Sequence, residues 1–450
     1  MINLGELLVR QAKIRSSFID LFSGCGGLSL GLMKSGWRGL FAVEQSPLAF
    51  KTLEHNLIDK NEHNTTRPHF DWPDWLEKKP FEIKAFVRTH REKLMGLRGN
   101  IQLVAGGPPC QGFSFAGKRT GDDPRNELFK YHLEIVEILR PELVLLENVQ
   151  GIETAFGAGK GRKGEHRKSY AKKIRDMLEA HDYEVQQDVL KALDFGVPQV
   201  RPRYFTVGIR RDLLCYEEAP NLFSLLNNNR TEFLKQRGLP TNRPVTVMEA
   251  ISDLAVTLKH FVECKDEESP PGFKEIIYEG PKTHYQRLMH EGMINGKPLN
   301  SIRLANHRPE TIHKFQKILD TCRKGVQLSP ADKLRLGIKK NAITPLSPHQ
   351  PSHTITTLPD DLLHYDEPRI HTVREHARLQ SFPDWFEFRG KYTTGGNMRT
   401  IECPRYTQVG NAVPPLLSEA IGDGLLYILQ ELIARSVSIT FSELTNNSFA

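Results

Sequence analysis

The sequence predicts an α/β protein built on a doubly wound, mostly parallel sheet. Short apolar segments typical of strands alternate with helical segments through the first half of the 450 residues. Two strand segments end in turns rich in glycine or proline, at 23–27 and 106–109. Ligands of such sheets bind at the carboxyl ends of the strands, so we expect the functional site at these turns.

The composition is that of an ordinary globular protein, with 39% hydrophobic and 26% charged residues. A formal net charge of +7 permits a polyanionic partner. The N-terminus lacks the apolar core of a signal peptide, and no stretch approaches the roughly 18 apolar residues of a membrane span. We therefore expect a cytoplasmic protein without a membrane partner. The six cysteines form no Cys-x-x-Cys pair, which argues against a zinc site or a disulfide scaffold.

The predicted elements follow from local patterns of apolar residues. Strands are expected at 17–22, 40–44, 101–105, 143–146 and 204–209. Helices are expected at 28–34, 47–56, 127–139, 371–380 and 414–433. A strand that is followed by a helix and then by another strand favours parallel pairing.

Three segments interrupt this alternation. Residues 57–100 are polar without a clean period, residues 156–175 include a Gly-Lys-Arg run, and residues 211–350 are irregular and polar. The third is long enough to form a separate lobe. The predicted division is a discontinuous first domain at 1–210 and 351–435, a smaller irregular lobe at 211–350, and a weakly patterned tail at 436–450 that frays.

The most specific motif is Gly-Gly-Pro-Pro-Cys-Gln-Gly-Phe-Ser, at residues 106–114. It directly follows a strand segment, and its glycines and prolines restrict the backbone that presents Cys110. A thiol on such a rigid turn suits nucleophilic attack. A small cysteine packed beneath a turn is the alternative.

A Gly-rich turn between the first strand and the first helix is a candidate cofactor cradle. Gly24, Gly26 and Gly27 let a ligand approach backbone amides at the helix start. Glu44 ends the next strand, where an acid accepts hydrogen bonds from ribose hydroxyls, so an adenosine-type ligand is indicated. Ser29 replaces the third glycine of the dinucleotide fingerprint, which argues against a nicotinamide dehydrogenase. A turn of packing value alone, with Glu44 solvated, is the alternative.

Charged residues also stand beside two later strand segments. Glu147 ends the strand at 143–146 and could share a crevice with Cys110, holding a proton for a ring nitrogen. Arg201 and Arg203 flank Pro202, and alternation places both on one face, where they suit a carbonyl, phosphate or carboxylate. The alternatives are a solvated loop acid and an exposed basic edge.

Together these segments resemble the cytosine-5 DNA methyltransferase family of the bacterial or phage restriction-modification type. The matching segments, in family order, are 18–27, 106–114, 147–149, 199–203, 374–383 and 410–415. The resemblance implies a Rossmann-like fold of S-adenosylmethionine-dependent methyltransferases, with the lobe at 211–350 as the target-recognition region. It also implies methyl transfer from S-adenosylmethionine to carbon 5 of a cytosine in duplex DNA.

The resemblance further implies roles for individual residues. Cys110 would add to carbon 6 of cytosine, Glu147 would act at ring nitrogen 3, and Arg203 and Arg201 would hold the carbonyl. Because stacking buries carbon 6, the base must be flipped out. The cofactor contacts implied are Phe22, Gly24, Gly26, Gly27, Glu44, Pro108, Leu128 and Asn411. The DNA contacts expected on a closing loop are Gln111, Ser114, Lys118 and Arg119.

One family feature has no clear counterpart in the sequence. The family has an acid that contacts the adenine ring after the second helix, and here Asp71 and Asp74 are the nearest acids in the 57–100 insert. Neither is preferred. The run 160–175, with eight Lys or Arg against one Glu, is either a solvated face or a phosphate contact.

The expected partner is double-stranded DNA, bound by a monomer, with a cognate restriction endonuclease as a companion acting on the same site. Two alternatives stay open. One is the branch of this fold that methylates a tRNA cytosine, although a large basic lobe favours duplex DNA. The other is a non-catalytic DNA-binding relative, against which the presence of Cys110, Glu147 and Arg203 counts.

Overall fold

A six-stranded sheet in the order β2-β1-β3-β4-β6-β5 forms the centre of the molecule. This computed structural model describes residues 16–60, 66–109, 128–153, 169–215, 217–395, 398 and 401–447, with side chains up to residue 436. The strands are β1 (Ser17–Leu21), β2 (Arg38–Val43), β3 (Leu103–Gly106), β4 (Leu143–Asn148), β5 (Tyr183–Lys191) and β6 (Pro202–Arg210). Neighbouring strands from β2 to β4 are parallel, and β6 runs antiparallel to β4 and β5. The predicted doubly wound, mostly parallel sheet is confirmed.

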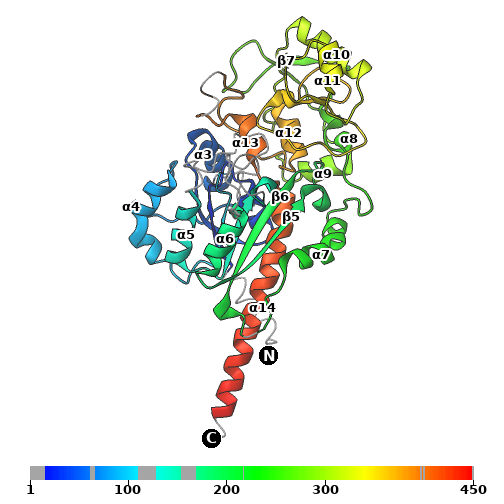
Figure 1. The fold of residues 1–450 in the computed structure, drawn as a ribbon. Coiled ribbons are helices and arrows are strands. Elements are labelled where there is room, and N and C mark those ends of the chain that lie inside the picture. Colours follow the sequence, from blue (N-terminus) through cyan, green and yellow to red (C-terminus); the bar gives the residue numbers. More distant parts are fainter. Residues whose placement is uncertain are drawn as a thin grey trace, which may run out of the picture.

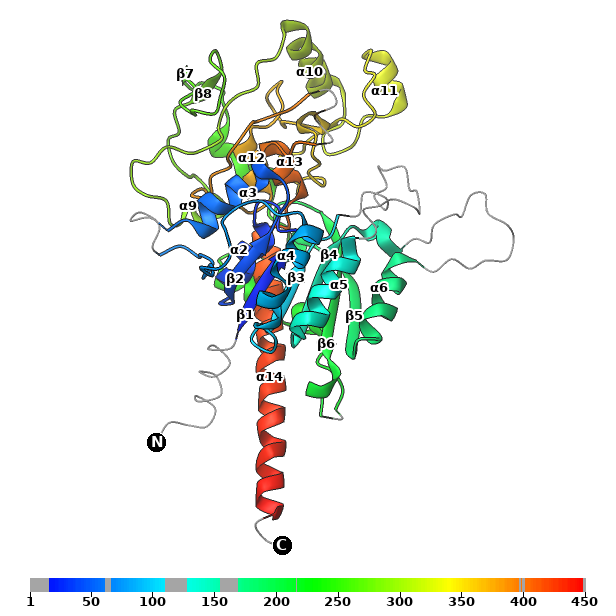
Figure 2. The same cartoon turned by 90° about the vertical axis from the view of Figure 1, so that its left-hand side faces the viewer.

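Alternate side chains of the strands pack on opposite faces of this sheet. Phe18 belongs to one hydrophobic cluster, whereas its neighbour Ile19 belongs to the other. The helices α2 (Gly27–Lys34), α7 (Leu222–Gln236) and α14 (Pro415–Asn447) cover the first face. The helices α4 (Ile83–Met95), α5 (Leu128–Leu139) and α6 (Tyr170–Glu179) cover the second (Figure 2). The result is a three-layer α/β/α arrangement with both faces of the sheet buried.

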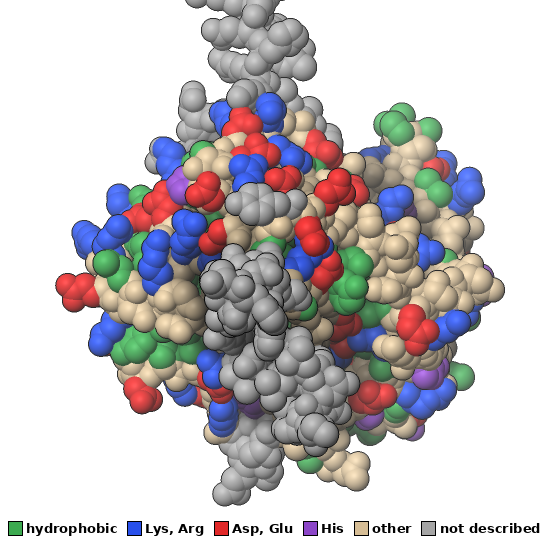
Figure 3. Space-filling view, turned by 90° about the horizontal axis from the view of Figure 1, so that it is seen from below, with side chains coloured by type: hydrophobic (Ala, Val, Ile, Leu, Met, Phe, Trp, Pro, Cys, Tyr) green, Lys and Arg blue, Asp and Glu red, His purple; other side chains and the backbone are tan. Residues whose placement is uncertain are grey.

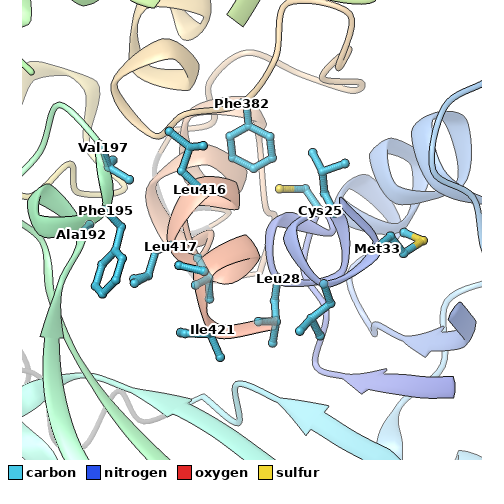
Figure 4. Close-up of a cluster of buried hydrophobic side chains, with 14 of the residues drawn as sticks. Cys25, Leu28, Met33, Ala192, Phe195, Val197, Phe382, Leu416, Leu417 and Ile421 are labelled. Atoms are coloured by element: carbon cyan, nitrogen blue, oxygen red, sulfur yellow. The ribbon is translucent and has the colours of Figure 1, made fainter. Parts of the chain in front are cut away.

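Helix α14 is the central helix of the first layer. Figure 4 shows Leu416, Leu417 and Ile421 of α14 between Leu28 of α2 and Phe195. Within the described residues, one helical stretch, Arg405–Ser436, is long and apolar enough to cross a membrane, contrary to the expectation from the sequence. The most apolar 18 residues of this stretch are 83% buried inside the protein, as is usual for a helix in a protein core.

Smaller elements lie beyond the carboxyl ends of the parallel strands (Figure 1). They are α8 (Val247–Ile251), α9 (His284–His290), α10 (Pro309–Thr321), α11 (Pro330–Arg335), α12 (Val373–Leu379), α13 (Arg405–Asn411), β7 (Phe261–Glu263), β8 (Lys274–Ile276), β9 (Thr344–Pro345) and β10 (Leu362–Leu363). The buried Arg378 of α12 links this helix to α8, because it donates to the carbonyl of Ala250, and it also donates to Asp253 and Asp384. The division into domains at 210 and 351 stays a prediction, since the hydrophobic cluster beneath α14 includes residues from both sides of these boundaries.

Short helical turns complete the chain. Helix α3 (Pro47–Leu53) continues into a π-helical turn, η1 (Glu54–Ile58). The 3-10 turns are η3 (Gln150–Glu153), η4 (Ala192–Phe195), η5 (Arg211–Leu213), η6 (Ser252–Leu254) and η7 (Pro359–Asp361). The lower face of the molecule mixes Lys and Arg with Asp and Glu, and neither sign dominates it (Figure 3).

Four expectations about local structure were incomplete. Helix α4 lies in the insert that lacked a clean period, although its buried residues Ile83, Phe86, Val87 and Leu94 follow helical spacing. Strand β5 was missed because it is an edge strand with few buried side chains. Five helices, α7 to α11, stand in the segment described as irregular. The tail expected to fray continues α14 to Asn447, since an established helix adds each further residue at little cost.

Candidate active site

Several residues singled out from the sequence lie at one edge of the sheet. Glu44 follows β2, Gly107 follows β3, and Glu147 is the last residue but one of β4, at the carboxyl edge. Strand β6 begins at the same edge because it runs antiparallel, so Arg203 lies there as well. Strand β1 lies between β2 and β3, so the strand order reverses beside it. Open α/β sheets bind ligands at such a point, at the carboxyl ends of the strands.

Glu147 and Arg203 form a largely buried ion pair on one face of the sheet. The Nε atom of Arg203 lies 3.0 Å from Oε1 of Glu147, with side-chain exposures of 12% and 13%. Burial is the largest influence on Glu147 and raises its pKa, although the guanidinium groups of Arg203 and Arg201 act to lower it. The carboxyl group is therefore disposed to hold a proton while a cation stands beside it.

The segment that leads to Cys110 lies against this pair. A Cβ added to Gly107 would stand 3.1 Å from Oε2 of Glu147, so only glycine fits there without displacing the acid. The side-chain amide of Asn148 donates to the carbonyl of Pro108 at 3.5 Å. Cys110 itself and the expected DNA contacts Gln111, Ser114, Lys118 and Arg119 lie outside the described residues.

Arg201 is fully buried, and its two terminal nitrogens bond to backbone carbonyls. The guanidinium donates to the carbonyls of Ile355 at 3.1 Å, Gly410 at 2.9 Å and Ala412 at 2.8 Å. Arg203 therefore pairs with Glu147, whereas Arg201 contacts the backbone of late segments of the chain. Its predicted contact with the base stays untested.

The Gly-rich turn and Glu44 are in direct contact. Oε2 of Glu44 accepts a hydrogen bond from the Gly24 amide at 2.8 Å, and Oε1 accepts one from the Ser46 amide at 2.7 Å. Gly24 has φ +57°, and a Cβ there would meet no described atom within 4 Å. The turn thus leaves open space beside an acid, and this arrangement fits a ligand with ribose hydroxyls.

The other two glycines of the turn are required for packing. A Cβ at Gly26 would stand 2.7 Å from Leu53, and one at Gly27 would stand 2.4 Å from the carbonyl of Val413. The second contact places the segment that contains Asn411 directly against the Gly-rich turn. Phe22 and Leu128 are half-buried at the margin of the hydrophobic cluster on the opposite face of the sheet.

Asp71 and Asp74, the two acids that the sequence offered for contact with an adenine ring, occupy different places in the structure. The amide of Asp71 donates to Gly39, near the start of β2, and is therefore remote from the carboxyl edge. Asp74 lies exposed in a turn. The amide of Phe81, by contrast, donates to the carbonyl of Glu44 at 2.8 Å, which brings the next residue, Glu82, to the site. Glu82 was not singled out from the sequence, although an aromatic residue and an acid directly before a helical segment were a usable signal.

The fold and this edge define a class of protein: a Rossmann-like α/β protein with a Gly-rich turn, an acid and an arginine at the carboxyl edge of its sheet. The sequence profile described as "C-5 cytosine-specific DNA methylase" matches residues 16–426. The chain belongs to this family and is a DNA (cytosine-5-)-methyltransferase of the restriction-modification type.

Several Type II methyltransferases are similar along nearly the whole chain. M1.HphI of Haemophilus parahaemolyticus is 32% identical over 418 residues, covering 91% of this chain and 86% of that protein. M.MthTI of Methanothermobacter thermautotrophicus is 30% identical over 408 residues, covering 89% and 94%. The crystal structure of a prophage-encoded protein of E. coli matches with a TM-score of 0.60 at 24% identity, covering 92% and 99%, and supports the fold.

Proposed function

We propose that this methyltransferase modifies a flipped-out cytosine in a specific duplex DNA sequence through a covalent Cys110 adduct. The observation that supports it most is the buried Glu147–Arg203 pair, with Gly107 of the nucleophile motif packed against Glu147. A nucleophile, a proton donor and a cation beside a cytosine ring are the groups that attack at carbon 6 requires.

In the proposed reaction the Cys110 thiolate bonds to carbon 6, and the proton of Glu147 passes to ring nitrogen 3. Carbon 5 thereby becomes nucleophilic. S-adenosylmethionine supplies the methyl group that carbon 5 takes up. A base then removes the proton from carbon 5, the proton on nitrogen 3 returns to Glu147, and the bond to Cys110 breaks. Arg203 holds the cytosine carbonyl and stabilises the charge that develops on it.

The cofactor is proposed to lie along the carboxyl edge. Glu44 binds the ribose, while the open backbone at Gly24 admits the ligand. Gly26 and Gly27 shape the turn, and the remaining contacts are Phe22, Pro108, Leu128 and Asn411. We further propose Glu82, rather than Asp71 or Asp74, as the acid near the adenine ring, because it follows the residue that pairs with Glu44.

The DNA is proposed to contact the loop residues Gln111, Ser114, Lys118 and Arg119 and the lobe at 211–350. The functional unit is proposed to be a cytoplasmic monomer, with a restriction endonuclease of the same specificity as its companion. Bisulfite sequencing of DNA from cells that express the protein would give the base and the sequence context together.

Trapping on DNA that contains 5-fluorocytosine tests the covalent step. Fluorine at carbon 5 cannot leave as a proton does, so the wild-type protein should stay bonded to such DNA in the presence of S-adenosylmethionine. Cys110→Ala should bind the same DNA without a denaturation-resistant adduct. An adduct formed equally by both proteins, or by neither, contradicts the proposed nucleophile.

A further inference from the structure

The buried Arg201 lies in a network that joins two parts of the proposed site. Its side chain is 0% exposed, and among the described residues no carboxylate forms an ion pair with it. Its two terminal nitrogens donate to three backbone carbonyls, two of which, Gly410 and Ala412, flank Asn411. A planar guanidinium can reach these carbonyls together, whereas the ammonium group of a lysine cannot reproduce this geometry.

Two glutamines complete the network. Oε1 of Gln199 accepts a hydrogen bond from the Ile355 amide at 2.8 Å, and its amide donates to Oε1 of Gln380 at 2.8 Å. Gln380 in turn donates to the carbonyl of Val409 at 2.7 Å. The chain just before β6 is thus linked to the segment 409–412 by side chains that are themselves buried.

One end of this network lies at the proposed cofactor site, and the other lies at the proposed base site. Residues 409–413 pack against the cofactor turn, since the carbonyl of Val413 lies where a Cβ of Gly27 would be. Arg203, two residues after Arg201, pairs with Glu147 on the base side. A shift of either end would therefore be transmitted to the other through these buried hydrogen bonds.

We propose that Arg201 is a positioning residue that holds the cofactor-side segment 409–412 in register with the strand that presents Arg203, and that it does not contact the base. This inference rests on the proposed cofactor site. A positioning role predicts that substitution of Arg201 lowers the affinity for the cofactor. A contact with the base would instead predict that the substitution lowers turnover alone.

Calorimetric binding of S-adenosylhomocysteine to the full-length protein tests the proposal. Arg201→Lys should weaken binding about tenfold or more, the effect of removing one charge-assisted hydrogen bond. Gln380→Met, which removes the bond to Val409, should weaken binding in the same direction. Arg203→Lys is the matched control and should bind S-adenosylhomocysteine like the wild type, while its kcat falls.

Wild-type affinity of Arg201→Lys for S-adenosylhomocysteine, together with a fall in kcat like that of Arg203→Lys, would overturn the proposal in favour of base contact. If thermal unfolding shows that Arg201→Lys does not fold, Gln380→Met decides, and unchanged affinity overturns the proposal. A wild-type protein that fails to bind S-adenosylhomocysteine would instead contradict the proposed cofactor.

Discussion

At Glu147, burial and a neighbouring cation act in opposite directions on one carboxyl group. Desolvation favours the neutral acid, and the guanidinium of Arg203 favours the carboxylate. The net effect raises the pKa, so the group can both hold a proton and release it to a nearby ring nitrogen. Gly107 contributes by leaving the space that the carboxyl group occupies.

Replacement of Glu147 by Gln should lower kcat by about 10²–10⁴-fold, because an amide keeps a hydrogen bond but has no proton to transfer. DNA affinity, measured by fluorescence anisotropy, should stay within about twofold of the wild type. Since burial raises the pKa of Glu147, the wild-type rate should fall as pH rises through that pKa. A variant with wild-type kcat contradicts the assignment of Glu147 as the acid.

Asp20 predicts a pH dependence of stability. It is buried, accepts a hydrogen bond from Ser29 at 2.5 Å, and burial raises its pKa to about 7 from an ordinary 3.8. The folded protein therefore binds an extra proton between these values, and stability is lost as pH rises toward 7. Asp20→Asn should remove this loss, which amounts to about 3 kcal/mol between pH 5 and the folded-state pKa of about 7. Urea unfolding at pH 5 and pH 8 measures it.

The exposed Asp74 provides the control for this experiment. Asp74→Asn should show the same difference in unfolding free energy between pH 5 and pH 8 as the wild type, because its side chain is exposed. An equal pH dependence in Asp20→Asn and in the wild type would show that Asp20 does not titrate as its burial predicts.

At the scale of elements, close backbone approach joins α2 to α14. A Cβ at Gly31 would stand 2.3 Å from the Cβ of Ser418 and 2.5 Å from the carbonyl of Pro415. The indole of Trp37 donates to the carbonyl of Gly422 at 3.0 Å, which ties the chain after α2 to the same helix. Helix α14 thereby packs against α2, the helix that begins at the Gly-rich turn, and helps to hold that turn in place.

Gly31→Ala should destabilise the protein by about 1–3 kcal/mol, because the added methyl group must displace backbone atoms of α14. The matched control is Gly96→Ala at the end of α4, where the nearest atom, the Lys93 carbonyl, lies at 3.4 Å and φ is −66°. This control should change stability by less than about 1 kcal/mol. Equal thermal midpoints for Gly31→Ala and the wild type would contradict the close α2–α14 packing.

At the scale of the whole molecule, charge is unevenly distributed over the predicted lobe. The segment 309–340, which contains α10 and α11, has eight Lys or Arg against three Asp or Glu. Five of these cations are exposed, and four of the five, Lys314, Lys317, Arg323 and Lys339, form no ion pair with a described residue, whereas Arg335 pairs with Asp332. A polyanion placed over the catalytic edge would be attracted to such a surface.

Neutralising these four cations to Gln should flatten the dependence of log Kd for duplex DNA on log salt, by about 0.9 for each phosphate that is no longer neutralised. The control replaces the exposed Lys84 and Arg88 of α4, on the sheet-covering layer, and should leave the slope unchanged. Identical slopes for the wild type and the four-residue variant would remove the support for DNA contact by this part of the lobe.

Local sequence patterns predicted five of the six strands, some of the connecting helices and the motifs at the strand ends, because periodicity and turn residues act over a few positions. Glu44 and Glu147 were placed from the sequence for that reason. Tertiary structure decided which of these groups meet. Arg201 bonds to a carbonyl 211 positions away, and Glu82 reaches the site through the pairing of Phe81 with Glu44. Such partners depend on how distant segments pack, and no local pattern encodes that.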